Sequence, residues 1–268
     1  MEDRCLVETR ARSNLFDLRG TTALVTGGNS GLGLAYARGL ARHGANVVIW
    51  GRDEAKSERA AETLRALGAT VARQKVDVTD EHQVVRGFAS AVEMMGRINC
   101  VIQNAGFSNP ASSFLNMTSA QWSAQIEVAL TGGFYTLREA ARHMVKSAAD
   151  GFRNNSIILC GSGLISAGMK GLEHYAAAKA GLAAMMRCMV AELSEYGIRI
   201  NMISPGYTRT EIAVSQELVD FIAKRTPLKR VAETEDLEAA AVYLASPGAR
   251  HHTGDVLTID GGWLASYL

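Results

Sequence analysis

Short apolar runs alternate along the chain with longer segments in which apolar residues recur at helical spacing. Several runs are almost continuously apolar, as expected for strands covered by helices on both faces. They predict seven strands, at Thr22–Thr26, Asn46–Trp50, Thr70–Val76, Asn99–Gln103, Ser156–Cys160, Arg199–Ser204 and Val256–Ile259. The longer segments predict helices near Gly33–His43, Asp53–Leu67, Glu81–Met95, Ala120–Lys146, Glu173–Glu195 and Glu235–Ala245. This alternation predicts an α/β fold with a doubly wound parallel sheet and helices on both faces.

The chain shows no internal domain boundary. It has only four prolines in 268 residues and no low-complexity linker. We therefore predict one domain over residues 18–268, preceded by an N-terminal extension over residues 1–17.

Composition excludes several classes of protein. Hydrophobic residues make up 47%, charged residues 21%, and the net charge is +1, so nothing favours nucleic acid or an anionic membrane. The longest apolar stretch, Ala176–Leu193, contains Lys179 and Arg187 and indicates a buried helix. The polar N-terminus lacks the apolar core of a signal peptide. Four cysteines lie without metal-ligand or redox spacing, three of them in apolar segments: Cys5, Cys100, Cys160 and Cys188. We expect a cytoplasmic protein with no metal site.

A glycine-rich turn links the first strand to the first helix. It reads Thr26-Gly27-Gly28-Asn29-Ser30-Gly31-Leu32-Gly33. Glycines allow the backbone to turn sharply and to approach a pyrophosphate, while the helix N-terminus directs N–H groups toward it. In its strand-turn-helix context the motif predicts a dinucleotide site.

Five motifs together resemble the short-chain dehydrogenase/reductase family, over roughly residues 18–263. After the glycine-rich turn come Gln103-Asn104-Ala105-Gly106, then Ser162, then Tyr175 and Lys179, and then the segment from Asn201 through Pro205-Gly206 to Thr210. The resemblance implies a single-domain Rossmann fold, a nicotinamide cofactor and a homotetramer. It implies cofactor contacts from Gly27, Asn29, Ser30, Gly31, Leu32, Gly33, Arg52, Asp77, Val78, Asn104, Ala105, Gly106, Tyr175, Lys179, Pro205, Gly206, Thr208 and Thr210.

The end of the second strand favours NADP(H), with NAD(H) as the alternative. NAD enzymes place a carboxylate there for the ribose hydroxyls, and it would repel a 2′-phosphate. Here Gly51 takes that place and Arg52 follows, whose guanidinium suits a phosphate.

Tyr175 and Lys179 lie four residues apart and so share one face of a helix. A free tyrosine has a pKa of about 10, and a neighbouring ammonium favours the phenolate. The resemblance makes Tyr175 the general acid in reduction and the general base in oxidation. It implies that Lys179 lowers the pKa of Tyr175 and binds the nicotinamide ribose. It implies that Ser162 donates a hydrogen bond to the substrate oxygen.

One position departs from the family. Its usual Val-Asn-Leu-x-Gly appears here as Val128-Ala129-Leu130-Thr131-Gly132, so alanine replaces the asparagine of the catalytic tetrad. In the family, this asparagine helps to hold a water that connects the lysine to solvent, partly through its main-chain carbonyl. Alanine keeps the carbonyl but lacks the side-chain amide that locally opens the helix, so we expect a slower or altered proton relay. Restoring asparagine (Ala129→Asn) should raise turnover.

The leading hypothesis is a reductase of an oxo group in acyl, polyketide or secondary metabolism. Residues 217–223 are a candidate lid, whose apolar side chains favour a partly apolar substrate. One alternative is a sugar or polyol dehydrogenase of the same family. The other is a non-catalytic nucleotide sensor, suggested by Ala129 but opposed by intact Ser162, Tyr175 and Lys179. An acyl-carrier partner would meet basic residues after the lid.

Overall fold

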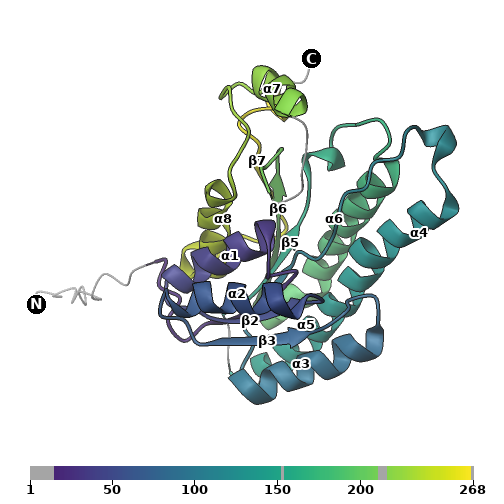
Figure 1. Ribbon diagram of the computed structural model, residues 1–268. Coiled ribbons are helices and arrows are strands. Elements are labelled where there is room, and N and C mark those ends of the chain that lie inside the picture. The colour runs from purple at the N-terminus through teal and green to yellow at the C-terminus, as the bar shows by residue number, and fades with distance from the viewer. Residues whose placement is uncertain (1–14, 152–153, 211–215, 267–268) are drawn as a thin grey trace, which may run out of the picture.

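The protein is built on a seven-stranded sheet (Figure 1). The computed structural model describes residues 15–151, 154–210 and 216–266. All strands are parallel, in the order β3-β2-β1-β4-β5-β6-β7. Their bounds are Thr22–Thr26 for β1, Asn46–Gly51 for β2, Val71–Lys75 for β3, Cys100–Gln103 for β4, Asn155–Cys160 for β5, Ile198–Pro205 for β6 and Val256–Ile259 for β7. The predicted doubly wound α/β fold is confirmed.

Helices cover both faces of the sheet. They are α1 (Gly31–Arg42), α2 (Glu54–Arg65), α3 (Glu81–Met95), α4 (Ser119–Ile126), α5 (Gly132–Ala149), α6 (Glu173–Leu193), α7 (Gln216–Arg225) and α8 (Glu238–Ala245). Alternate residues of β2 enter two different cores: Val47 and Ile49 pack in the core that α1, α2 and α8 cover, Val48 and Trp50 in the core of α3, α5 and α6. This two-sided burial explains why the central strands are apolar without alternation.

Side-chain caps set the start of two predicted helices. The Asp53 carboxylate accepts a hydrogen bond from the Lys56 backbone N–H at the start of α2. Asp80 does the same for Gln83 at the start of α3, and the Gln83 amide donates back to it. These caps satisfy backbone donors that the first turn leaves without helical partners.

The long helix predicted over Ala120–Lys146 is wrong in one respect. It is divided into α4 and α5 by a π-helical turn at Glu127–Thr131, where the Gly132 N–H bonds to the Glu127 carbonyl. The helix is thus open at Ala129 although the side-chain amide is missing. A Cβ on Gly132 would lie 2.9 Å from the Val78 carbonyl oxygen. We attribute the open turn to this close packing.

Three smaller features complete the comparison with the sequence. Cys100 and Cys160 are buried, as expected for cysteines in apolar segments. Cys188 is exposed, contrary to that expectation, because it lies on the outer face of α6. Cys5 lies outside the described residues. The candidate lid forms α7, whose Val219 and Ile222 pack with Val231. The first turn of the last predicted helix is a 3₁₀ turn, Thr234–Leu237.

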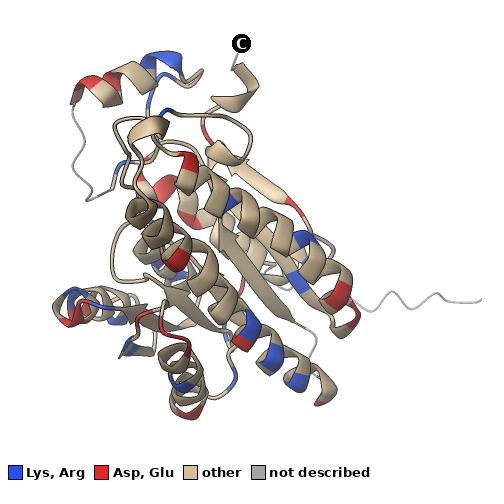
Figure 2. Ribbon diagram, turned by 90° about the vertical axis from the view of Figure 1, so that its right-hand side faces the viewer, with Lys and Arg blue, Asp and Glu red and all other residues tan. Residues whose placement is uncertain are grey.

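Charge is dispersed over the surface. In the view of Figure 2, basic and acidic residues are interspersed on the helices of the described part of the chain. This agrees with the net charge of +1. Within the described ranges, no helix has the length and apolar character needed to cross a membrane.

Candidate active site

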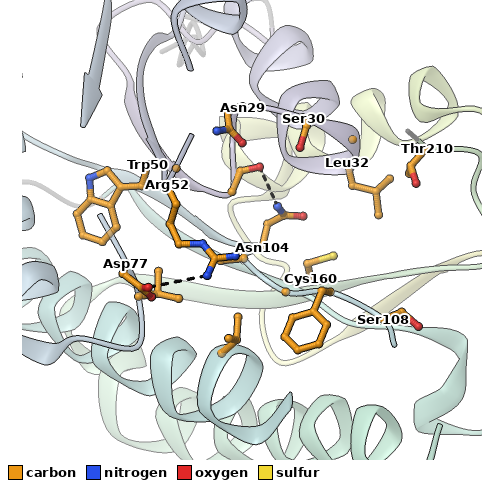
Figure 3. A pocket seen from close by; sticks show the side chains of 18 of the residues that line it. Asn29, Ser30, Leu32, Trp50, Arg52, Asp77, Asn104, Ser108, Cys160 and Thr210 are labelled. Carbon is orange, nitrogen blue, oxygen red and sulfur yellow. Dashed lines mark hydrogen bonds and ion pairs between the residues drawn. The ribbon is translucent and has the colours of Figure 1, made fainter. Parts of the chain in front are cut away.

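A cavity of about 410 Å³ lies at the carboxyl edge of the sheet (Figure 3). It is lined by most of the residues predicted to bind the cofactor: Gly27, Asn29, Ser30, Gly31, Leu32, Arg52, Asp77, Val78, Asn104, Ala105, Gly106, Tyr175, Lys179 and Thr210. The predicted residues that do not line it are Gly33, Ser162, Pro205, Gly206 and Thr208. The cavity thus brings together segments from both halves of the chain.

The glycine-rich turn forms one wall. Gly27 and Gly31 have φ values of 62° and 51°, a conformation that favours glycine. A Cβ on Gly33 would lie 2.2 Å from the Gly27 carbonyl oxygen, so no side chain fits there. Gly33 therefore shapes the turn from behind the cavity. The N-terminus of α1 faces the cavity through Gly31 and Leu32, which suits an anion.

Asn104 ties β4 to the end of β1. Its Nδ2 donates to the Thr26 carbonyl at 3.0 Å, and the Thr26 hydroxyl accepts from the backbone N–H groups of Asn104 and Ala105, each at 2.9 Å. These bonds hold the Asn-Ala-Gly segment against the glycine-rich turn. A flat group could then lie along it.

Arg52 and Asp77 face each other across another part of the cavity. Arg52 Nη1 lies 3.9 Å from Asp77 Oδ2, and the Arg52 side chain is 71% exposed. The long, exposed guanidinium remains available to an anionic ligand (Figure 3). Asp77 also accepts hydrogen bonds from the Thr79 backbone and hydroxyl, which fix its carboxylate.

Asn29 fills the space beside Gly51. Its Nδ2 donates to the Ser57 hydroxyl at 3.1 Å and to the Asp53 carbonyl at 3.3 Å. A Cβ on Gly51 would lie 2.3 Å from that same nitrogen. Position 51 therefore cannot take a carboxylate without moving Asn29.

Tyr175 and Lys179 both line the cavity from α6. The Lys179 ammonium is almost fully buried, donates to the Cys160 carbonyl at 2.6 Å, and lies 5.7 Å from the centre of the Tyr175 ring. Ser162 follows β5, where its hydroxyl accepts from the Leu164 N–H at 3.2 Å and caps a short 3₁₀ helix.

The segment after β6 is held to β7. Gly206 N–H donates to the Ile259 carbonyl at 2.8 Å, and a Cβ on Gly206 would lie 2.6 Å from Asp260 Cα. The Thr208 hydroxyl donates to the Gly206 carbonyl, which places both residues in a tight turn. Of this segment, Thr210 reaches the cavity.

Sequence reasoning missed several lining residues: Trp50, Val76, Phe107, Ser108, Val128 and Cys160. Most of them directly flank predicted residues, so continuing each motif by one or two positions finds them. Cys160 differs, because in the sequence it is only one more apolar residue of a predicted strand. Its sulfur lies 3.8 Å from the Tyr36 hydroxyl, and burial raises the Tyr36 pKa well above 10.0, which keeps that phenol neutral.

The other histidines and acids do not suggest metal chemistry. His174 is buried and is not a lining residue of the cavity, while His252 bonds to Tyr243 and Asp255. The described part of the chain contains no group of three His, Cys, Asp or Glu side chains arranged to hold a metal.

Known proteins resemble this chain over nearly its full length. The family profile described as enoyl-(acyl carrier protein) reductase matches residues 27–264. Gluconate 5-dehydrogenase of Gluconobacter oxydans (strain 621H) is 33% identical over 253 residues, 93% of this chain and 96% of the relative. The 3-oxoacyl-(acyl-carrier-protein) reductase of Chlamydia pneumoniae is 32% identical over 247 residues, 91% and 97%.

The fold comparison agrees. The crystal structure of a gluconate 5-dehydrogenase from Burkholderia cenocepacia J2315, in complex with NADP and tartrate, has a TM-score of 0.87 and 31% identity, and the match covers 94% of this chain and 98% of that one. Since sequence and fold match together from the glycine-rich turn to the last strand, the chain belongs to the short-chain dehydrogenase/reductase family, the oxidoreductases that act on CH–OH and C=O groups.

Proposed function

We propose that this enzyme reduces a ketone of a small molecule with NADPH. The observation that carries the proposal is one cavity with Tyr175 and Lys179 in its wall and the Gly51–Arg52 step in another part. A dinucleotide is the kind of ligand that reaches from one to the other. The Burkholderia gluconate 5-dehydrogenase, which is similar throughout, was crystallised with NADP.

The residues fit the cofactor in their donor set and in their shape. The glycine-rich turn and the α1 N-terminus would hold the pyrophosphate, Arg52 the 2′-phosphate, and Lys179 the nicotinamide ribose. Asp77 and Val78 would hold the adenine edge, and Pro205, Gly206, Thr208 and Thr210 the carboxamide end. When bound, the nicotinamide supplies the hydride.

The protein supplies the proton and the geometry. Ser162 would donate a hydrogen bond to the carbonyl oxygen as negative charge develops there. Tyr175 would pass its hydroxyl proton to that oxygen, and the Lys179 ammonium would stabilise the phenolate that remains. In alcohol oxidation the same groups act in reverse.

The lid supports an oxo substrate of partly apolar character, of the acyl, polyketide or secondary-metabolite type. In α7, Val219 and Ile222 pack with Tyr207 and Val231, which leaves Leu218 and Phe221 as exposed apolar side chains that could meet a substrate. A sugar acid or polyol is the second candidate, which the similarity to a gluconate 5-dehydrogenase favours.

The test is consumption of NADPH and, in parallel, NADH with a panel of ketones: a 3-oxoacyl thioester, a diketone, a ketose, a keto sugar acid and an aromatic ketone. We expect higher kcat/KM with NADPH, and Arg52→Gln should remove most of that preference while leaving the NADH rate unchanged. Tyr175→Phe should keep NADPH affinity and lose turnover by a factor of at least about 10². Tight NADPH binding without turnover of any substrate would favour the nucleotide sensor instead.

A further inference from the structure

An unusual set of polar atoms is buried between α4 and α6. Among the described residues, seven buried side-chain nitrogen or oxygen atoms have no hydrogen-bond partner in the protein. Four of them belong to three residues: both amide atoms of Gln125, Glu173 Oε2 and His174 Nδ1. Gln125 is 0% exposed and His174 1%. Burying such groups without partners costs free energy, so a grouping of this kind calls for an explanation.

The three residues lie on two helices that pack together, and we call the contact between these helices the seam. Gln125 is the one buried residue of α4, and α4 packs against α6, which begins with Glu173 and His174 (Figure 1). The helices run in the same direction because each leads from one parallel strand to the next. Farther along, a Cβ on Gly181 would lie 3.1 Å from the Leu130 side chain. Gln125 lies about one and a half helical turns before Leu130, and the same distance before Gly181 lies within the first two turns of α6. Gln125 is therefore placed beside the start of α6.

The seam adjoins the reacting groups. His174 directly precedes Tyr175, and Lys179 follows one turn later on the same helix. On the other side, Gln125 lies one turn before the buried Ala129 of the π-helical turn, and Val128 of that turn lines the cavity. Turns with π-helical hydrogen bonds occur frequently at functional sites.

We propose that Gln125 and His174 hold internal water in this seam and thereby return protons to Tyr175, in the role that the missing amide at position 129 would have served. Buried water needs two to four polar partners; Gln125 and His174 offer three unpartnered atoms, and Glu173 Oε2 is a fourth. This inference rests on the proposed chemistry of Tyr175 and Lys179.

The proton balance is simple. In each reduction one hydride adds to the carbonyl carbon, and one proton leaves the Tyr175 hydroxyl for the carbonyl oxygen. The phenolate then regains one proton from bulk solvent, through Lys179 and the waters of the seam. Gln125 and His174 form and break no covalent bond in this sequence. Both are positioning residues that orient the waters.

A double-mutant cycle between Gln125→Leu and Ala129→Asn tests the proposal. We expect Gln125→Leu to lower kcat about tenfold, a smaller effect than loss of a direct acid–base group. The KM for the ketone and the Kd for NADPH should change less than about twofold, because neither ligand touches the seam. The solvent deuterium isotope effect on kcat should rise, and Ala129→Asn should restore kcat more in the Gln125→Leu background than in the wild-type background.

Two further variants keep the test decisive. Gln125→Met, which retains the length of the side chain, replaces Gln125→Leu if that protein folds poorly. Ser147→Ala is the matched control, because Ser147 also has a buried, unpartnered oxygen but lies in the last turn of α5, away from the cavity. It should leave kcat and the isotope effect unchanged.

Different failures are distinguishable. If the Gln125 variants lower Tm but leave kcat and the isotope effect at wild-type values, Gln125 serves packing alone and the inference is wrong. A loss of kcat that Ala129→Asn does not recover also overturns it, because the two amides then do not substitute for each other. Absence of turnover in the wild type itself, with NADPH bound, would overturn the proposed function as well.

Discussion

At the scale of single residues, the space beside Gly51 is already filled. The Asn29 amide occupies the volume where a side chain at position 51 would project, and its two hydrogen bonds to the start of α2 keep it there. A side chain at position 51 therefore requires Asn29 to move, while Arg52, the next residue, extends into the cavity. The absence of a carboxylate at position 51 and the guanidinium of Arg52 would both favour a ligand with a 2′-phosphate.

We expect Gly51→Asp to lower NADPH affinity by more than about tenfold, because it adds both a clash and a negative charge beside the 2′-phosphate. Gly51→Ala adds the clash alone and should weaken NADPH and NADH binding to a similar extent. Fluorescence titration with both cofactors measures the two effects. An unchanged ratio of the two affinities in Gly51→Asp would show that position 51 does not take part in selection.

At the scale of elements, α1 and α8 meet at one buried carboxylate. A Cβ on Gly39 would lie 2.9 Å from Glu238 Cβ, so the helices approach closely. The Glu238 carboxylate is buried and accepts from Arg38 Nε at 3.0 Å and from Arg42 Nη1 at 2.6 Å. Each oxygen thus has a cation, and the pairing fixes how α8 lies on α1.

Glu238→Gln should reduce the free energy of unfolding by about 1–3 kcal/mol, since Arg42 loses its carboxylate and Arg38 keeps only the exposed Glu235. Glu235→Gln is the control. Glu235 pairs with Arg38 at 2.5 Å but is 59% exposed, and its loss should cost about 0–1 kcal/mol. Urea unfolding of both variants measures the two losses in free energy of unfolding. Equal losses would show that burial of the carboxylate does not matter.

The elements were also the most predictable part of the molecule. β1, β7 and α3 have the bounds that the sequence predicts, because apolar runs and the Asp80 cap mark them locally. The π-helical turn was not predictable, because no residue of Glu127–Thr131 marks it locally, and the close approach of Gly132 to Val78 joins positions far apart in the sequence. The exposure of Cys188 could not be read either, since its apolar neighbours in sequence lie on other faces of α6.

The candidate site shows the same division. The glycine-rich turn, Asn104, Tyr175 and Lys179 were found from motifs, and they line one cavity. The contact between Asn29 and Gly51 joins residues 22 positions apart and has no local signature. The unpartnered amide of Gln125 was also invisible, because a glutamine in a helical segment is ordinarily exposed.

At the scale of the whole molecule, stability depends on the protonation of His143. Its pKa is lowered from the usual 6.5 by burial and by the positive charges of Arg97 and Lys146. The neutral ring accepts a hydrogen bond from the Ile98 N–H at 3.3 Å. As the pH falls, the unfolded chain binds this proton before the native protein does. The contribution to stability is therefore complete above 6.5 and is lost as the pH falls through the native pKa.

His143→Gln keeps an acceptor for the Ile98 N–H but removes the titration. We expect its Tm to fall less than that of the wild type between about pH 7.5 and pH 5.5, where an unperturbed histidine titrates. Thermal unfolding followed by circular dichroism at several pH values gives both slopes. Equal slopes would mean that other groups cause the acid sensitivity.

The position of β1 has a consequence for the synthesis of the chain. This strand lies between β2 and β4. Its pairing with β2 is possible once the chain has been synthesised to residue 51, but its pairing with β4 must wait until Cys100–Gln103 has left the ribosome. Until then one edge of β1 would be unpaired, and all five residues of this strand are ones that the folded protein buries. Such an edge is a template for pairing with other chains. Fragments that end before β4 should aggregate, and folding during translation should depend on chaperones that shield this half of the sheet.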